Sequence, residues 1–183
     1  MAAVQNLFWE KGFESTSYAD LTKATGLGKG SLYSAFGNKQ ALYKKALETY
    51  IASELTSLGD LLLNGLKDDP DSWRDRLTGF LNSAIDAIEQ RKDRRGCFIC
   101  NAAIELAPFD PAIEEVVQDV FEKLKGALME VLAPLQDEAC AQQTAEQLLA
   151  TYLGMRVMAK AGSTAESLVA VRDRVMEGIN VAK

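Results

Sequence analysis

The spacing of apolar residues along the chain predicts helices throughout. Between Asn38 and Leu62 apolar residues recur at intervals of three and four, which places them on one face of a long helix. Prolines, glycines and capping residues divide the remainder into shorter segments of the same period, and later helices are expected over about residues 70–88, 97–107, 111–133, 138–161 and 164–180. With three short helices before Asn38, the pattern predicts an all-α fold of nine helices and no strands.

The segment from Ser17 to Phe36 has the pattern of two short helices joined by a tight turn. Ser17 followed by Asp20 forms a capping box, so a helix is expected to begin at Tyr18. Gly26 can adopt the left-handed conformation that ends a helix, and we expect Leu27 to fill the core between the two helices. The spacing therefore predicts a helix-turn-helix.

In a helix-turn-helix the second helix enters the major groove of DNA and its first residues face the base edges. The exposed candidates are Lys29, Gly30, Ser31, Tyr33 and Ser34. Leu32 and Phe36, four residues apart, are expected to face inward. A helical hairpin with no role in nucleic-acid binding accounts for the same spacing, so the pattern by itself leaves both interpretations open.

The charge of the chain is unevenly distributed. The net charge is −6, but residues 1–50 hold six Lys and four Asp or Glu, an excess of +2, and the remainder carries −8. The basic share thus coincides with the predicted helix-turn-helix, where positive charge favours phosphate binding. No apolar run reaches 18 residues and no signal peptide is evident, so we expect a cytoplasmic protein with no membrane association.

Residues 8–42 carry the motifs of a known family. They include the pair Gly12-Phe13, the capped Ala-Asp-Leu helix, the run Lys-Gly-Ser-Leu-Tyr from Lys29 to Tyr33, and Phe36-x-x-Lys39-x-x-Leu42. This segment resembles the N-terminal domain of the tetracycline-repressor (TetR) family of bacterial transcription regulators. The resemblance implies the DNA-binding residues Ser17, Gly28, Lys29, Gly30, Ser31, Tyr33, Ser34 and Lys39. Gly28 stands where the family usually has Ser or Thr.

The likeness extends into the rest of the chain through the segments from Arg95 to Leu106 and from Leu153 to Gly162. It implies a helix-turn-helix DNA-binding domain over residues 1–46 and a ligand-binding and dimerisation domain over residues 47–183. A family member of this kind binds a palindromic double-stranded DNA operator as a homodimer. A small-molecule effector then releases the repressor from DNA. A scaffold that does not bind DNA is the alternative, favoured by the acidic C-terminal part.

Ligand and dimer residues are expected in the C-terminal domain. Aromatic residues, methionines and isolated polar residues on apolar helices are candidate ligand contacts: Trp73, Phe80, Phe98, Asn101, Glu105, Phe109, Tyr152, Met155 and Arg156. Glu105 and Arg156 could equally form a structural ion pair. Apolar residues of the last two helices could supply both the internal core and a dimer interface, and the sequence does not distinguish the two roles. The candidates for the interface are Leu148, Tyr152, Leu168, Val171 and Val175.

The reactive residue types in the chain do not form a recognisable catalytic or metal site. Three cysteines, Cys97, Cys100 and Cys140, and no histidine cannot supply the usual four protein ligands of zinc, so no metal or cofactor is expected. The commonest general base is absent, and no nucleophile or phosphate-loop motif occurs, so no enzymatic activity is expected. Buried thiols are the default for these cysteines, and a thiol-based redox or electrophile sensor is the alternative.

Overall fold

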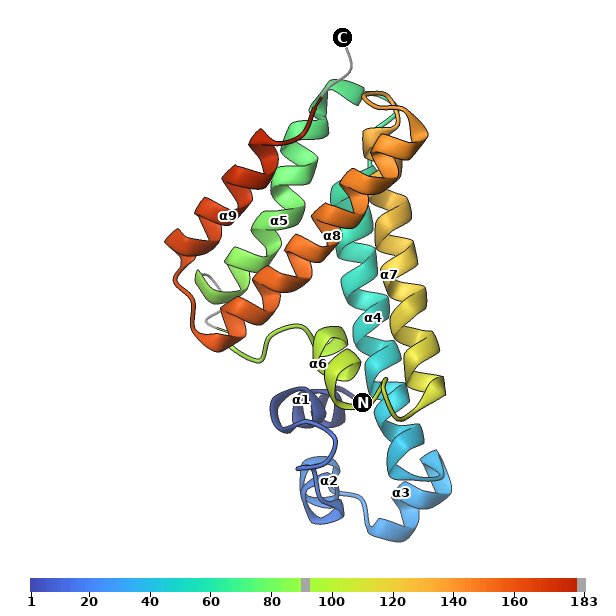
Figure 1. Cartoon of the computed structure of the whole chain (residues 1–183). Helices are drawn as coiled ribbons and strands as arrows, with labels where there is room; N and C mark the ends of the chain where they lie inside the picture. The colour runs from blue at the N-terminus through green and yellow to red at the C-terminus, as the bar shows by residue number, and fades with distance from the viewer. Residues whose placement is uncertain (90–92, 181–183) are drawn as a thin grey trace. The chain divides into compact units, whose positions relative to one another are not determined.

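The computed structural model describes residues 1–89 and 93–180, and these ranges are all-α (Figure 1). The predicted number of helices is confirmed for the described residues, which form nine α-helices and one short 3₁₀ helix. They are α1 (Ala2–Lys11), α2 (Tyr18–Thr25), α3 (Lys29–Phe36), α4 (Lys39–Leu63), the 3₁₀ helix η1 (Pro70–Ser72), α5 (Trp73–Glu89), α6 (Phe98–Glu105), α7 (Pro111–Leu132), α8 (Glu138–Ala161) and α9 (Ala165–Glu177). None of these helices is both long enough and apolar enough to span a lipid bilayer.

The chain divides into two compact units, and each unit is made of two segments that are separate in the sequence. The first unit comprises Met1–Glu54 and Phe98–Val117, and the second comprises Leu55–Cys97 and Gln118–Lys183. The first unit therefore contains α6 as well as the three N-terminal helices, and α4 and α7 each contribute residues to both units. The functional boundary expected at residue 46 remains a prediction.

The core of the first unit is an aromatic cluster built from α1, α4 and α6. The Tyr43 ring lies edge-on to Phe8, Phe13 and Phe98, with centroid distances of 5.1, 5.4 and 5.3 Å. Phe8, Tyr43 and Phe98 are each completely buried. Trp9 and Tyr50 extend the cluster, with their ring centroids 4.9 Å apart. Edge-to-face pairs of this kind stabilise a core beyond the burial of their area, so the cluster joins α6 firmly to α1 and α4.

In the second unit, α5 packs against α8 and α9 (Figure 1). Its apolar face buries Leu77, Phe80 and Leu81 completely, as the helical spacing predicted. The Phe80 ring lies 4.4 Å from the ring of Tyr152 on α8, and Leu168 of α9 is also fully buried. These contacts form the helical core of the second unit.

Helix ends follow the predicted capping residues in most places. The Asn38 side chain accepts a hydrogen bond from the Ala41 N–H at the start of α4, and α8 has the expected bounds. Residues 70–72 form a 3₁₀ turn before α5, with Pro70 as its first residue and Asp69 as its N-cap, although the Asp69 side chain makes no capping hydrogen bond. Ser163 does not cap the last helix. Thr164 caps α9 instead, its hydroxyl accepting a hydrogen bond from the Ser167 N–H.

Candidate nucleic-acid interface

The first helix of the predicted helix-turn-helix begins with a closed network of polar groups. The Ser17 hydroxyl accepts a hydrogen bond from the Asp20 N–H, and the Ser17 N–H donates to Asp20 Oδ2, which confirms the capping box. Asp20 Oδ1 lies 2.8 Å from Lys11 Nζ at the end of α1. The Lys11 hydrogen bond, followed by those of Ser17, holds the pKa of Asp20 far below its usual range. The network fixes the start of α2 to the end of α1.

The turn between α2 and α3 has the expected glycine but not the expected core residue. Gly26 has φ of +69° and ends α2 in the left-handed conformation. Leu27 is 42% exposed, so the prediction that it fills the core is wrong. Leu21 and Leu32, which are 0% and 3% exposed, occupy that core instead. The Leu27 N–H donates to the Thr25 hydroxyl, and this short turn directs the Leu27 side chain outward.

The surface of α3 carries most of the predicted DNA-binding residues. Gly28, Lys29, Gly30, Ser31 and Ser34 are all exposed, whereas Leu32 is buried and Phe36 is half-buried. The side chain of Tyr33 lies outside what the structure describes. A Cβ atom added at Gly28 or Gly30 would meet nothing within 4 Å, so packing within this chain does not require glycine there. Among the side chains of α3 that the structure describes, Leu32 is therefore the buried one, and the exposed ones are small or polar.

Two lysines of the predicted interface rest on aromatic rings. Lys29 Nζ lies 5.0 Å from the centroid of the Tyr18 ring, and Lys39 Nζ lies 4.3 Å from that of Phe13. Both distances are within the range of a cation–π interaction. These contacts restrict the flexible lysine stems and hold both ammonium groups near the start of a helix. An anionic backbone approaching α3 would therefore meet partly ordered positive charge.

Four of the predicted ligand residues belong to the first unit, where they do not share one role. Phe98 is fully buried in the aromatic cluster, Asn101 is half-buried, and Phe109 is 82% exposed. The Glu105 carboxylate accepts hydrogen bonds from the main-chain N–H groups of Phe13 and Glu14. Those two bonds engage both oxygens of Glu105, and the ion pair with Arg156 considered from the sequence remains a prediction.

The other five predicted ligand residues belong to the second unit. Phe80, Tyr152, Met155 and Arg156 are buried, and Trp73 is half-buried. Arg156 is only 4% exposed, and its Nη2 lies 3.4 Å from the carbonyl oxygen of Gly96. Its guanidinium carbon lies 5.9 Å from the Tyr152 ring centroid. The structure thus groups a buried cation with aromatic side chains, and their role as a ligand site remains a prediction.

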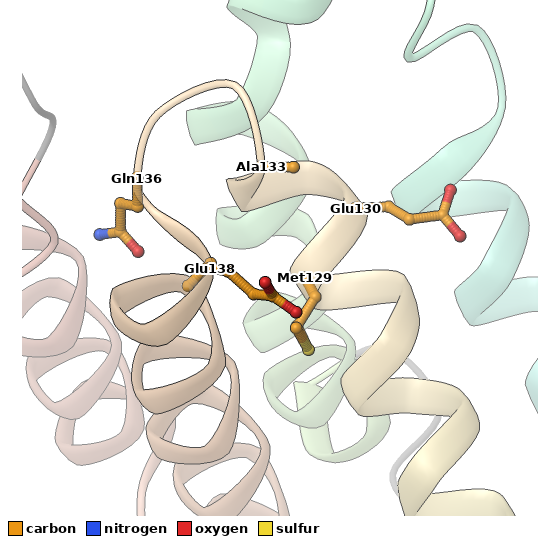
Figure 2. Close-up of a pocket in the computed structure, with 6 residues that line it drawn as sticks. Met129, Glu130, Ala133, Gln136 and Glu138 are labelled. Atoms are coloured by element: carbon orange, nitrogen blue, oxygen red, sulfur yellow. The ribbon is translucent and has the colours of Figure 1, made fainter.

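A cavity of about 350 Å³ lies where α7 turns into α8 (Figure 2). It is lined by Met129, Glu130, Ala133, Gln136, Glu138 and Ala141. Figure 2 shows the Glu138 side chain extending toward Met129, while the Glu130 carboxylate points away from them. None of these six residues belongs to the predicted ligand set, and the sequence offered no polar pattern that would have indicated a cavity here.

The predicted dimer residues divide between core and surface. Leu148, Tyr152 and Leu168 are at most 2% exposed within the chain itself, while Val171 and Val175 are half-buried. Other apolar residues of α8 are more accessible, with Val157 at 43% and Met158 at 36% exposure. Exposure was not deducible from spacing alone, because apolar residues occur on more than one face of α8.

The three cysteines form no disulfide with one another and differ in accessibility. Cys97 and Cys100 are buried and Cys140 is half-buried. Among the described residues, no cluster of three or more metal-ligating side chains occurs. Burial of Cys97 and Cys100 fits the packing role that small thiols usually have.

Both parts of the chain match models of known protein families. Residues 1–46 match the family of bacterial regulatory proteins, tetR family. Residues 74–174, more than half of the chain, match the LmrA/YxaF-like transcriptional regulator C-terminal domain. The two matches place the helix-turn-helix and the helical second part in the same kind of protein.

Individual relatives agree with the family matches. The chain is 27% identical over 149 residues to the uncharacterized transcriptional regulator YezE of Bacillus subtilis, covering 80% of this chain and 74% of that protein. It is 24% identical to the transcriptional repressor BdcR of Escherichia coli, over 98% of this chain and 86% of that protein.

Solved structures share the fold over nearly the whole length. A TetR regulator from Chloroflexus aurantiacus superposes with a TM-score of 0.83 at 26% identity, covering 98% of this chain and 92% of the other. A cysteine mutant of the TetR family regulator CifR, complexed with 26bp double-strand operator DNA, superposes with a TM-score of 0.81 at 25% identity, covering 97% and 95%. The chain belongs to the TetR family of bacterial transcription regulators.

Proposed function

We propose that this protein is a transcriptional repressor that binds a palindromic operator as a homodimer through α3 and is released from DNA by a small-molecule effector. The observation that carries the proposal is the surface of α3, where Lys29, Ser31 and Ser34 are exposed and Leu32 is the one buried side chain among those that the structure describes. An exposed helix that carries small polar residues and begins with a lysine has the form of a recognition helix. The repressor BdcR and the operator complex of CifR support the same role.

The proposed contacts follow from the chemistry of the exposed side chains. The ammonium groups of Lys29 and Lys39 bind phosphates or base edges, and the hydroxyl groups of Ser31 and Ser34 donate or accept hydrogen bonds in the groove. Gly28 and Gly30 present no side chain, which lets the α3 backbone approach DNA closely. Ser17 contributes from the start of α2, although its hydroxyl already serves the helix cap.

The proposed dimer interface is the exposed apolar stripe of α8. Its members are small or apolar and recur at intervals of three and four: Ala150, Gly154, Val157, Met158 and Ala161, all of them exposed. Small residues allow two helices to approach closely, and a symmetric pair would cover the stripe on both copies. In this proposal the exposed stripe of α8 takes the place of the buried Leu148, Tyr152 and Leu168 as the contact surface. Val171 and Val175 lie at the edge of the proposed interface.

The proposed effector site lies in the second unit around Arg156, Tyr152 and Phe80. The guanidinium is the charged group of that set, and it is nearly fully buried. Charge-assisted hydrogen bonds favour an anionic or strongly polar acceptor on the ligand, and the aromatic rings favour an apolar body. Such an effector releases DNA only if it binds the DNA-free conformation more tightly than the DNA-bound one.

The test is a footprint of the full-length protein on the DNA upstream of its own gene. We expect one protected site with two-fold symmetry. Lys29→Ala should lose protection, whereas the matched control Lys123→Ala should retain it, because Lys123 is an exposed lysine on α7 in the second unit. Equal protection by both variants would contradict the assignment of α3, and no protection by the wild type anywhere upstream would contradict operator binding.

A further inference from the structure

The turn after α1 is held by a side chain that is about ninety residues away in the sequence. Glu105, the last residue of α6, accepts a hydrogen bond from the Phe13 N–H at Oε2 and one from the Glu14 N–H at Oε1, both 2.9 Å long. All three residues belong to the first unit. Two consecutive main-chain N–H groups that point at one carboxylate form a small anion-binding nest, and this nest is closed within the chain.

The backbone preceding the nest is shaped for this contact. Gly12 has φ of +82°, a conformation that side-chain-bearing residues rarely adopt. A Cβ atom added there would lie 2.9 Å from Glu105 Oε2. Gly12 therefore provides both the bend that presents the two N–H groups and the space that the carboxylate occupies.

Hydrogen bonds within the turn join residues 12–16 to one another, so a displacement at Phe13 would also move the start of α2. The Thr16 side chain, which is fully buried, donates from its hydroxyl to the Gly12 carbonyl oxygen at 2.6 Å. The Thr16 N–H donates to the Phe13 carbonyl oxygen, and Ser17 then caps α2. The position of α2 is thus linked, bond by bond, to the carboxylate on α6.

We propose that Glu105 is a positioning residue for DNA binding: its carboxylate fixes the turn at Phe13 and Glu14, and thereby sets where α2 and α3 stand relative to α1 and α4. The inference rests on the proposed function, because it specifies what orients the DNA-contacting helices. Glu105 does not touch DNA in this scheme. It acts through the main chain of the turn, and without it the helix-turn-helix remains folded but is poorly oriented.

The experiment compares Glu105→Ala and Glu105→Gln with the control Ile104→Ala in the full-length protein. Ile104 is the neighbouring α6 residue and is 69% exposed, so its truncation should leave the turn intact. We expect Glu105→Ala to weaken operator binding by about tenfold or more, within the range of typical coupling between sites. Glu105→Gln keeps one acceptor oxygen and should have an intermediate effect. Ile104→Ala should bind as the wild type does.

A second readout distinguishes positioning from general destabilisation. Amide hydrogen exchange should accelerate at Phe13 and Glu14 in Glu105→Ala, while buried amides of α4 and the weak affinity for non-specific DNA stay unchanged. Unchanged exchange at these two amides would overturn the inference, and so would accelerated exchange with undiminished operator affinity. Should Glu105→Ala fail to fold, Glu105→Gln decides by the same criteria. A wild type that binds no operator would instead refute the proposed function.

Discussion

Helices α3 and α6 are both eight residues long and both belong to the first unit, yet they are used in opposite ways. In α6 the side chains of Phe98, Ile99, Cys100 and Ala102 are buried. In α3 only Leu32 is buried among the side chains that the structure describes. The number of buried side chains therefore distinguishes α6, which holds the first unit together, from α3, whose surface can bind a partner.

The comparison shows why helix content alone says little about function. A helix that makes most of its contacts inside the chain is constrained by packing, so its residues are replaceable only by others of similar shape. In a helix with few buried side chains, the choice of residues is constrained by the molecule that the helix binds outside the chain. Substitutions of the buried side chains of α6 should therefore change stability first, and substitutions of the exposed side chains of α3 should change DNA binding first.

The largest contrast is expected between Phe98→Ala and Ser34→Ala. Phe98 is completely buried against the rings of Tyr43 and Tyr50, so its truncation should lower the free energy of unfolding by about 3–5 kcal/mol. Ser34 is exposed, and its truncation should change that free energy by no more than about 0.5 kcal/mol. Urea denaturation measures both. Comparable losses would mean that α3 is as deeply packed as α6.

A second pair of substitutions tests two glycines of the first unit. Gly12→Ala should lower the free energy of unfolding by about 1–3 kcal/mol, because Gly12 has a positive φ and faces Glu105 Oε2. A Cβ atom at position 30 would meet nothing within 4 Å, so Gly30→Ala should raise the free energy of unfolding by up to about 1 kcal/mol, because alanine favours the helix. If Gly30 permits close approach to DNA, the stabilised variant should bind the operator less well. Denaturation and DNA-binding titrations of both variants check this.

The polar network at the start of α2 predicts a pH dependence. The pKa of Asp20 is held below its unfolded value, mainly by the Lys11 hydrogen bond, so the ionised carboxylate stabilises the fold at neutral pH. That contribution is complete above a pH of about 4 and is lost as the pH falls further toward the folded pKa. Wild type should therefore exceed Asp20→Asn in unfolding free energy at pH 7, with the difference shrinking in acid. A constant difference from pH 7 to pH 3 would contradict the network.

A small effect is expected for Tyr43→Phe. The Tyr43 ring is fully buried in the aromatic cluster, and within the described part of the chain its hydroxyl has no hydrogen-bond partner. Burial, and then the charge of Glu105, raises the pKa of this hydroxyl far above its usual range. Removing an unsatisfied hydroxyl should change the free energy of unfolding by less than about 1 kcal/mol and can increase it. Thermal denaturation measures the change, and a large loss would reveal a partner for the hydroxyl.

Features set by neighbouring residues were predictable from the sequence. The capping box at Ser17, the cap at Asn38 and the end of α2 at Gly26 depend on residues within one helical turn. Where two adjacent residues could serve, the sequence did not decide: Ser163 and Thr164 are both capable caps, and Thr164 is used. Likewise the direction of Leu27 depends on the geometry of a short turn that residue type alone does not fix.

Features set by distant residues were not predictable. Glu105 was expected near a ligand because a charged residue on an apolar helix needs a partner, and its partners are two main-chain N–H groups about ninety positions earlier. Nearly every residue has the same main-chain N–H group, so the sequence does not show which of these groups binds a distant side chain. Leu148 and Leu168 were candidates for both the internal core and a dimer interface, and spacing along one helix could not distinguish the two. Both are buried within the chain itself, where α8 and α9 pack against α5.

The salt dependence of operator binding tests the central claim, which is that the exposed residues of α3 contact DNA. Each phosphate neutralised by a lysine contributes about −0.9 to the slope of log affinity against log salt concentration. Lys29→Ala should reduce the slope by about 1 for each protein copy bound, and Lys123→Ala should leave it unchanged. Identical slopes for the wild type and Lys29→Ala, or an equal reduction in Lys123→Ala, would contradict the account.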